Sequence, residues 1–431
     1  MDYIEDLKSF LDSSVVNFYA IENAEKRLVE AGYKRISEDN PIHVLEGDKI
    51  YFKRNDLSIV ALNIGENSHS YGYPFHIIAS HVDSPCFKIK PHFGSSGTYG
   101  KIDVEPYGGM IASSWMDRLL SIAGRVNYKS KDKKIVSRLI NFDADLLMMP
   151  NLCIHFNRDI NSGYNYNFAV DTQPFIGEVD PGVLMDNIAK SFEIDVKDII
   201  THDLFVYNRD KSRVWGMEQE YISSPRLDDL ECVYTSLMAF INNDNPSAIN
   251  VLYLANNEEV GSASSTGADG DFLYSILNRI ARNFDINLEN ALNQSFLISA
   301  DNAHALHPNH PEFYDSKEAP MMNKGIVIKY NASNRYTSDS VSSAIFIDLL
   351  NQNNIPYQFF SNRSDIRGGS TLGNILLSHT SMMSVDIGLA QLAMHSSFET
   401  AGVKDVQYAI DAFSAFYKAK IYISDDYYKV N

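Results

Sequence analysis

Apolar runs along the chain end repeatedly in residues that can bind a metal ion or move a proton. The clearest run, Ile249 to Ala255, is followed by Asn256, Asn257 and the adjacent Glu258 and Glu259. Such a run predicts a buried strand, and open α/β sheets place their sites at strand ends. Adjacent strand residues face opposite ways, so both glutamates reach one pocket only where the strand has become a loop, which the asparagines favour. The simpler alternative is a polar loop after a core strand.

Two further runs end in residues of the same chemical type. Phe75 to Ser80 leads into His81 and Asp83, and Phe296 to Ala300 leads into Asp301. A histidine that binds a metal usually donates its other ring N–H to a carboxylate or carbonyl, and Asp83 is well spaced for that role. The alternatives are a surface histidine beside a turn aspartate, and a helix N-cap at Asp301.

His395 follows another short apolar run, in the stretch LAMHSSFET, where a structural histidine is the simpler alternative. In a chain with only 12 histidines, four such endings together indicate a metal site. Histidine and carboxylate ligands without cysteine suit a catalytic site that holds zinc or a similar divalent ion.

The stretch SSPRLDDLECVY adds two aspartates, Asp228 and Asp229, just after Pro225. The apolar spacing that follows, up to Ile241, predicts an amphipathic helix that begins near Asp228. Acidic residues at a helix start are favourable on their own, which is the structural alternative. Two metal ions held close together need a carboxylate between them, and an aspartate here could bridge.

The remaining pattern divides the chain into three parts. Helical spacing followed by two extended runs, Ile50 to Lys53 and Ser58 to Ile64, fills the beginning, and glycine-broken extended runs fill 91–225. Extended runs then alternate with helical patterns, which is typical of a sheet wrapped by helices. The helical positions are Ile4, Leu7 and Leu11; Ala20, Ala24 and Leu28; Phe272, Ile276 and Ile280; and Val341, Ile345 and Leu349. We expect an α/β fold, with a catalytic domain split into 1–90 and 226–431 by a β-rich insert at 91–225.

The amino-acid composition disfavours several classes of function. The chain carries 37 Lys and Arg against 55 Asp and Glu, a formal net charge of −18, which opposes binding to nucleic acid or anionic membranes. The start MDYIEDLKSF lacks the features of a signal peptide, and no apolar run approaches a membrane span. Three scattered cysteines fit a reducing compartment. We expect a cytoplasmic protein without a nucleic-acid or membrane partner.

Taken together, these motifs resemble those of the aspartyl aminopeptidase family of zinc metalloaminopeptidases. The matching blocks are HVDSP (from His81), YGGMIASSWMDR (Tyr107), IHFNRDIN (Ile154), SPRLDDL (Ser224), NNEEVGS (Asn256), SADNAHALHPNH (Ser299), IKYNASNRYTSD (Ile328) and QLAMHSSFE (Gln391). They follow the family order over essentially the full length, so the joint match is specific although each block alone is weak. The resemblance implies a mixed-sheet peptidase domain with two zinc ions, interrupted by a dimerisation domain.

The resemblance also implies the metal ligands residue by residue. His81, Asp228 and Asp301 would hold one divalent ion, and Asp228, Glu259 and His395 would hold the other, with Asp228 as the bridge. The ions would be zinc, with cobalt or manganese as alternatives.

The resemblance further implies the catalytic groups. Glu258 would be the general base, and Asp83 would orient His81. The family usually has asparagine where this chain has Asp229, so the charge beside the bridge differs from the family pattern.

Substrate contacts and assembly are implied in the same way. Lys329 matches the family lysine that meets an acidic substrate side chain, and Tyr336 matches a tyrosine at the substrate carbonyl. His155 matches a residue that reaches a neighbouring subunit's site, in dimers that assemble to a dodecamer. The alternatives are a snorkelling lysine, a core tyrosine and a packed strand histidine. The substrates would be peptides with N-terminal Asp or Glu, although the segment DIRGGSTLG departs from the family pattern.

Two other functions compete with this interpretation. An amidohydrolase or deacylase of related two-metal fold would share most of the ligands but cleave N-acyl amino acids and leave free N-termini intact. A non-catalytic scaffold would assemble without hydrolysis, which the complete ligand set disfavours. No G-x-S-x-G motif supports a serine nucleophile.

Overall fold

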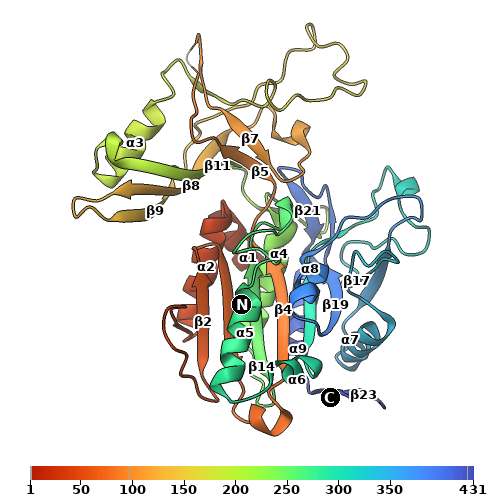
Figure 1. The fold of residues 1–431 in the computed structure, drawn as a ribbon. Helices are drawn as coiled ribbons and strands as arrows, with labels where there is room; N and C mark the ends of the chain where they lie inside the picture. The colour runs from red at the N-terminus through yellow and green to blue at the C-terminus, as the bar shows by residue number, and fades with distance from the viewer. Residues whose placement is uncertain (1, 96, 425) are drawn as a thin grey trace. The chain divides into compact units, whose positions relative to one another are not determined.

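The chain forms two compact units in the computed structural model, which describes residues 2–95, 97–424 and 426–431 (Figure 1). The larger unit comprises the chain up to Asp83, Ser212–Met394 and Glu399–Asn431. The smaller unit comprises Ser84–Lys211 and the short segment His395–Phe398. Its main part therefore begins and ends earlier in the sequence than the expected insert at 91–225.

A nine-stranded mixed sheet forms the centre of the larger unit within the described residues. Its strands, in spatial order, are β1 (Lys34–Arg35), β2 (Lys49–Arg54), β3 (Ser58–Ile64), β14 (Ile249–Ala255), β4 (Phe75–His81), β15 (Phe296–Ala300), β19 (Met383–Gly388), β17 (Ile326–Tyr330) and β18 (Tyr357–Ser361). The central strands β14, β4, β15 and β19 are parallel to one another. Their carboxyl ends therefore meet at the same edge of the sheet.

Helices cover both faces of this sheet, because its strands are buried and apolar on both sides. One face packs against α1 (Tyr3–Ser13), α2 (Asn17–Glu30), α4 (Leu227–Ile241), α7 (Ser340–Gln352) and α9 (Val403–Lys418). The other face packs against α5 (Phe272–Asn283), α6 (Leu288–Asn293) and α8 (Leu372–His379). In β4, Ile78 belongs to the first core whereas Ile77 and Ala79 belong to the second. The predicted α/β fold class is confirmed.

Helix α4 is buried on more sides than its sequence pattern predicts. Its apolar spacing predicts an amphipathic helix, but every residue from Leu227 to Phe240 is buried. The helix contacts α1, α9, β4 and β14, so its polar face is also covered by protein. A helix at the centre of a large core carries polar residues inside only where they are needed or paired.

Truncating Ile78 should weaken the core directly beneath the end of β4. Its side chain is fully buried in the first core. We expect Ile78→Ala to lower the free energy of unfolding by about 2–5 kcal/mol, and Ile78→Val by about 0.5–1.5 kcal/mol. Urea unfolding followed by circular dichroism measures both. Equal stability of the alanine variant and the parent would contradict this packing.

Two smaller sheets complete the larger unit among the described residues. One has the strand order β12 (Arg213–Trp215), β13 (Tyr221–Ser224), β21 (Glu399–Gly402), β20 (Ala390–Leu392) and β16 (Ala303–His304). The other pairs β22 (Ile421–Ile423) with β23 (Tyr428–Val430).

The smaller unit is built around its own antiparallel sheet. The order is β7 (Val104–Tyr107), β5 (Cys86–Ile89), β11 (Ile199–Asn208), β8 (Leu120–Lys129) and β9 (Ile135–Asn141). A two-stranded pair of β6 (Gly100–Lys101) and β10 (Phe175–Gly177) and the helix α3 (Val183–Phe192) belong to the same unit. Leu184 and Ile188 of α3 lie in the core of this unit. Among the described residues, no helix of either unit combines the length and apolar character needed to cross a bilayer.

Asp405 is a buried carboxyl group in the first turn of α9. It accepts hydrogen bonds from the backbone N–H groups of Asn323 and Gly325 at 2.5 and 2.8 Å. Burial raises its pKa to about 7, although these two N–H groups act in the opposite direction. The folded-state pKa thus lies above the value of about 3.9 in an unfolded chain. The stability linked to this proton is fully present below about pH 4 and is lost as the pH rises through 7.

The metal-free protein should therefore lose stability between pH 5 and pH 8, by at most about 3 kcal/mol from this group. The Asp405→Asn variant cannot ionise at this position, so its free energy of unfolding should fall less over the same interval. Urea unfolding of both proteins at the two pH values tests the difference. Identical pH dependence would show that the Asp405 proton does not contribute.

Candidate metal centre

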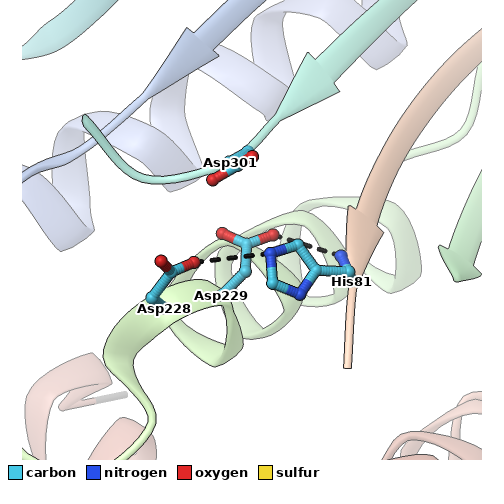
Figure 2. Close-up of side chains that lie close together, drawn as sticks. All are labelled: His81, Asp228, Asp229 and Asp301. Carbon is cyan, nitrogen blue, oxygen red and sulfur yellow. Dashed lines mark hydrogen bonds and ion pairs between the residues drawn. The ribbon is translucent and has the colours of Figure 1, made fainter. Parts of the chain in front are cut away.

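Four buried side chains converge at the carboxyl ends of the central strands (Figure 2). His81 ends β4, Asp301 directly follows β15, and Asp228 and Asp229 lie in the first turn of α4. Each offers one ligand atom, and these atoms all lie within 4.8 Å of one another. We call these four residues the His81 cluster. Three distant stretches of sequence thus meet at one point of the larger unit.

Strand register explains why His81 and Asp301 meet. The parallel strands β4 and β15 pair Ala79 with Ser299, so two residues further on His81 and Asp301 lie side by side. Residues two apart on a strand point to the same face, which brings both side chains to the same side of the sheet.

The ring of His81 is held by Asp83. Its Nδ1 lies 3.0 Å from the backbone carbonyl oxygen of Asp83 and 3.6 Å from the Oδ1 atom of the same residue. A carbonyl oxygen only accepts, so Nδ1 carries the hydrogen, and Nε2 faces Asp228 Oδ1 at 3.4 Å. Asp83 thus contacts the ring of His81, with the shorter contact made by its backbone, and its role in orienting a metal ligand stays a prediction. Fixing one ring nitrogen in this way leaves the other available to a metal ion.

The start of α4 turns both aspartates inward. Asp228 has the non-helical angles φ −80° and ψ 110°, and the peptide bond between Asp228 and Asp229 is cis. The N–H of Asp228 donates to Glu399 Oε2 at 3.0 Å, while Asp229 Oδ2 accepts from the N–H of His81 at 3.2 Å. Asp229 Oδ1 is buried and accepts no hydrogen bond from the described residues. An acceptor in that state fits a bound cation, because burial without a partner is costly.

The paired glutamates occupy a loop directly after β14. Asn257 and Gly261, with φ of 62° and 93°, flank the short 3-10 turn Glu258–Val260. Asp83 accepts hydrogen bonds from the N–H groups of both Glu258 and Glu259, at 3.1 and 3.2 Å. A second group of possible ligand atoms, within the same 4.8 Å limit, consists of His81, Glu258 and Glu259. Asp83 thus positions both the histidine and the glutamate loop, and the expected turn between strand and glutamates is present.

Like charges crowd this site in the absence of metal ions. Burial first, and then the carboxylates of Asp301 and Asp228, raise the pKa of Asp229 well above its usual range. Burial, Asp301 and Asp83 raise the pKa of Glu258 to about 8. Burial opposes a charged imidazole, yet the contacts with Asp228 and Asp83 outweigh it and hold the pKa of His81 well above its usual value. Divalent cations would relieve this repulsion, and one histidine with several carboxylates is a donor set that zinc accepts.

Lys329 is the nearby buried cation. It is the second-to-last residue of β17 and is only 2% exposed. Its Nζ donates a hydrogen bond to the backbone oxygen of Asp301 at 2.8 Å. Burial opposes its charge, but Asp301 and Asp386 outweigh that effect and raise its pKa. The ammonium lies 5.2 Å from the ring centre of the buried Tyr336. The snorkelling alternative is wrong, because the whole side chain is enclosed.

Two predicted residues lie in the smaller unit. His395 has a left-handed φ of 66°, and its Nδ1 lies 2.5 Å from the backbone oxygen of Gly109. His155 lies in an exposed turn region, so the alternative of a packed strand histidine is wrong. The metal-ligand role of His395 and the substrate role of His155 both stay predictions.

Two residues that the structure places here were not among the metal ligands or catalytic groups expected from the sequence. Asp229 belongs to the His81 cluster, although only Asp228 was expected to supply a ligand. Glu399 holds the backbone of Asp228 from β21, and it ends the QLAMHSSFE block. The sequence signal for Asp229 was its charge where the family usually has asparagine. Nothing in the sequence alone distinguished Glu399 from other acidic residues.

The whole chain is similar to known aminopeptidases in sequence and in fold. "Probable M18 family aminopeptidase 2" of Clostridium acetobutylicum is 42% identical over 428 residues, which cover 97% of this chain and 99% of that protein. The structure also matches a chain of the Ape4 and Nbr1 complex, with a TM-score of 0.92, 33% identity and coverage of 96% of this chain and 85% of that one. The S. cerevesiae mApe1 dodecamer matches with a TM-score of 0.86, 27% identity and 96% coverage of each chain. Sequence and fold together place the chain among the M18 family aminopeptidases.

The family follows from a match over almost the full length. The family model described as aminopeptidase I zinc metalloprotease (M18) matches residues 10–417. The chain belongs to this family, so the family predicted from the sequence blocks is confirmed.

Proposed function

We propose that the chain is a dinuclear-metal aminopeptidase that removes N-terminal residues, above all Asp and Glu, from peptides. The observation that carries the proposal is the buried His81 cluster, whose four ligand atoms lie within 4.8 Å of one another beside Glu258 and Glu259. Membership of the M18 family supports the peptidase class. The two-metal arrangement and the acidic preference are the parts that need testing.

The proposed ligands form two sets that share one carboxylate. His81, Asp228 and Asp301 hold the first ion, and Asp228, Glu259 and His395 hold the second. The buried acceptor Asp229 Oδ1 and the crowded carboxylates support a site for cations at this point. Zinc suits the donor set best, and cobalt or manganese are alternatives that share its preference for nitrogen and oxygen ligands.

When bound, a pair of divalent ions lowers the pKa of a water and polarises the scissile carbonyl. Glu258 accepts the proton of the attacking water and returns it to the leaving amine, as a general acid/base does. Asp83 holds the loop of Glu258 through two backbone N–H groups and also fixes the ring of His81. Asp83 thereby fixes the positions of the general base Glu258 and of the metal ligand His81 relative to each other.

Lys329 and Tyr336 are proposed to contact the substrate. The Lys329 ammonium is enclosed beside Asp301 and Tyr336. A protein of net charge −18 repels acidic peptides at long range, so a local cation such as this ammonium is needed to attract a substrate carboxylate. Tyr336 is proposed to meet the substrate carbonyl, and His155 to reach the site of a neighbouring subunit.

The proposed assembly is a homo-oligomer of dimers that builds a dodecamer in the cytoplasm. Support comes from the similarity to the S. cerevesiae protein, whose structure is described as a dodecamer. The insert between the two halves of the catalytic domain is the proposed dimerisation element.

A panel of free-amine amino-acid p-nitroanilides, assayed with defined zinc, cobalt or manganese, tests the activity. We expect Asp and Glu substrates to be cleaved in preference to Ala and Leu substrates. Cleavage of N-acyl amino acids with no action on free amines would favour a deacylase instead. If no substrate were hydrolysed with any of the three metals, a non-catalytic scaffold would be the remaining function.

The acidic preference should depend on Lys329. We expect Lys329→Met to lower kcat/KM for the Glu substrate by about 10- to 100-fold, while the value for the Leu substrate changes much less. The matched control is Lys26→Met, which removes an exposed lysine of the same unit. An equal loss for both substrates, with normal metal content, would remove Lys329 from the specificity site.

A further inference from the structure

A pocket of the larger unit lies where the parallel strands β17 and β18 end. It is lined by residues of 330–335 and 361–368, and its volume is about 670 Å³. Tyr330, the last residue of β17, pairs with Ser361, the last residue of β18, so the two lining segments leave the sheet side by side. β17 runs antiparallel to β19, so β17 and β18 run in the opposite direction to the central strands that carry the His81 cluster. A hollow of this size accommodates several groups of a peptide.

The pocket carries uncompensated positive charge. Three arginines line it, Arg335, Arg363 and Arg367, against the single acid Asp365. Arg363 already pairs with Asp365 through two contacts of 2.6 Å. Within the described part of the chain, the side chains of Arg335 and Arg367 form no ion pair and no hydrogen bond. Two guanidinium groups are thus available to a ligand in one hollow.

A pocket with two available guanidinium groups is unusual in a protein with 55 acidic and 37 basic residues. Arginine presents a planar set of N–H donors that matches a carboxylate in a two-pronged contact. The long-range field of the chain repels anions, so a local pair of arginines is what allows a carboxylate to bind. Arg367 lies in the DIRGGSTLG stretch, where the chain departs from the pattern of the aspartyl aminopeptidase family.

Two residues that line the pocket are adjacent in the sequence to the proposed substrate contacts. Tyr330 immediately follows Lys329, and Arg335 immediately precedes Tyr336. Lys329 in turn donates to the backbone of Asp301 in the His81 cluster. One wall of the pocket therefore begins and ends one residue from the side chains proposed to hold the N-terminal residue of a peptide.

We propose that this pocket is a subsite for a carboxylate of the peptide beyond the residue that is removed. The carboxylate is either an acidic side chain or the free C-terminus of a short peptide. The proposal rests on the proposed aminopeptidase function, because that function makes the ligand a peptide. It differs from the proposed role of Lys329, whose enclosed ammonium is not among the lining groups of this pocket.

Peptide binding to the full-length, zinc-loaded Glu258→Gln variant tests the subsite without turnover. Three peptides are compared by calorimetry: Asp-Ala-Glu amide, Asp-Ala-Gln amide, and Asp-Ala-Gln with a free C-terminus. We expect at least one of the two peptides with a downstream carboxylate to bind about fivefold more tightly than Asp-Ala-Gln amide, a modest factor typical of partly exposed charge pairs. The preference should shrink at high salt.

Substitutions then locate the effect. Adding Arg367→Gln or Arg335→Gln should remove the preference, and Arg367→Lys should keep part of it. The control Arg282→Gln removes an exposed arginine elsewhere in the same unit and should keep all of it.

Each result has a defined meaning. Tighter binding of the Glu amide identifies the side chain as the ligand, and tighter binding of only the free acid identifies the C-terminus. Equal binding of all three peptides, no binding of any, or a preference that survives both glutamine substitutions would overturn the subsite. The aminopeptidase proposal fails on a different result, namely that the unsubstituted enzyme cleaves no free-amine substrate.

Discussion

Replacing Glu258 by glutamine should reduce kcat by about 10²- to 10⁴-fold while the protein keeps its bound metal. Glutamine preserves the shape of the side chain but cannot accept the proton of the attacking water. The backbone N–H of residue 258 still donates to Asp83, so the loop should stay in place. Steady-state kinetics together with metal analysis of the same preparation measures both parts of this expectation.

The neighbouring glutamate provides the matched comparison. Glu259→Gln changes the same group by the same chemistry one residue further on, but Glu259 is proposed to bind the second ion. It should therefore lose both activity and metal, whereas Glu258→Gln should lose activity alone. Unchanged turnover in Glu258→Gln, or an equal loss of metal in both variants, would remove Glu258 from the role of base.

Replacing Asp228 by asparagine should have the other large effect. Asp228 is proposed to bridge the two ions, and its side chain lies 3.4 Å from His81 Nε2. Loss of one bridging charge should weaken metal binding by more than about 100-fold, since even partners outside the ligand set contribute 10- to 100-fold. Activity should fall with it to the level of metal-free protein. Zinc titration of the metal-free protein, followed by assay at each point, measures both.

The control for Asp228→Asn is Asp411→Asn, which removes one exposed carboxylate from α9 in the same unit. Its metal binding and activity should match those of the parent. If Asp228→Asn bound zinc as tightly as the parent and remained active, Asp228 would be a helix-start residue and the bridge would lie elsewhere.

The strands that carry the site were predictable because their hydrophobic patterns are strong. The runs Ile249 to Ala255 and Phe296 to Ala300 coincide with β14 and β15, and Ser58 to Ile64 coincides with β3. Runs buried on both faces leave little choice of structure, and the residues that follow them fall at the sheet edge by necessity. This is why the sequence could indicate that His81 and Asp301 lie close together, as their ligand atoms do within 4.8 Å.

Other features depend on tertiary packing and left weaker signals. The apolar spacing of helix α4 predicts an amphipathic helix, yet every residue from Leu227 to Phe240 is buried, because α1, α9, β4 and β14 all contact the helix. Asp229 joins the His81 cluster because the backbone at residues 228 and 229 departs from helical angles, which apolar spacing does not report. Glu399 reaches Asp228 from a strand 171 residues further along the chain. Such contacts depend on how distant segments of the chain pack together, which no local sequence pattern encodes.

The most direct test of the central claim is a crystal structure of zinc-loaded protein with anomalous data collected on both sides of the zinc edge. We predict two strong peaks that share Asp228 as a common ligand, with His81 and Asp301 at the first and Glu259 and His395 at the second. Zinc bound elsewhere, or an His81 cluster without any anomalous peak, would contradict the account of a two-metal peptidase.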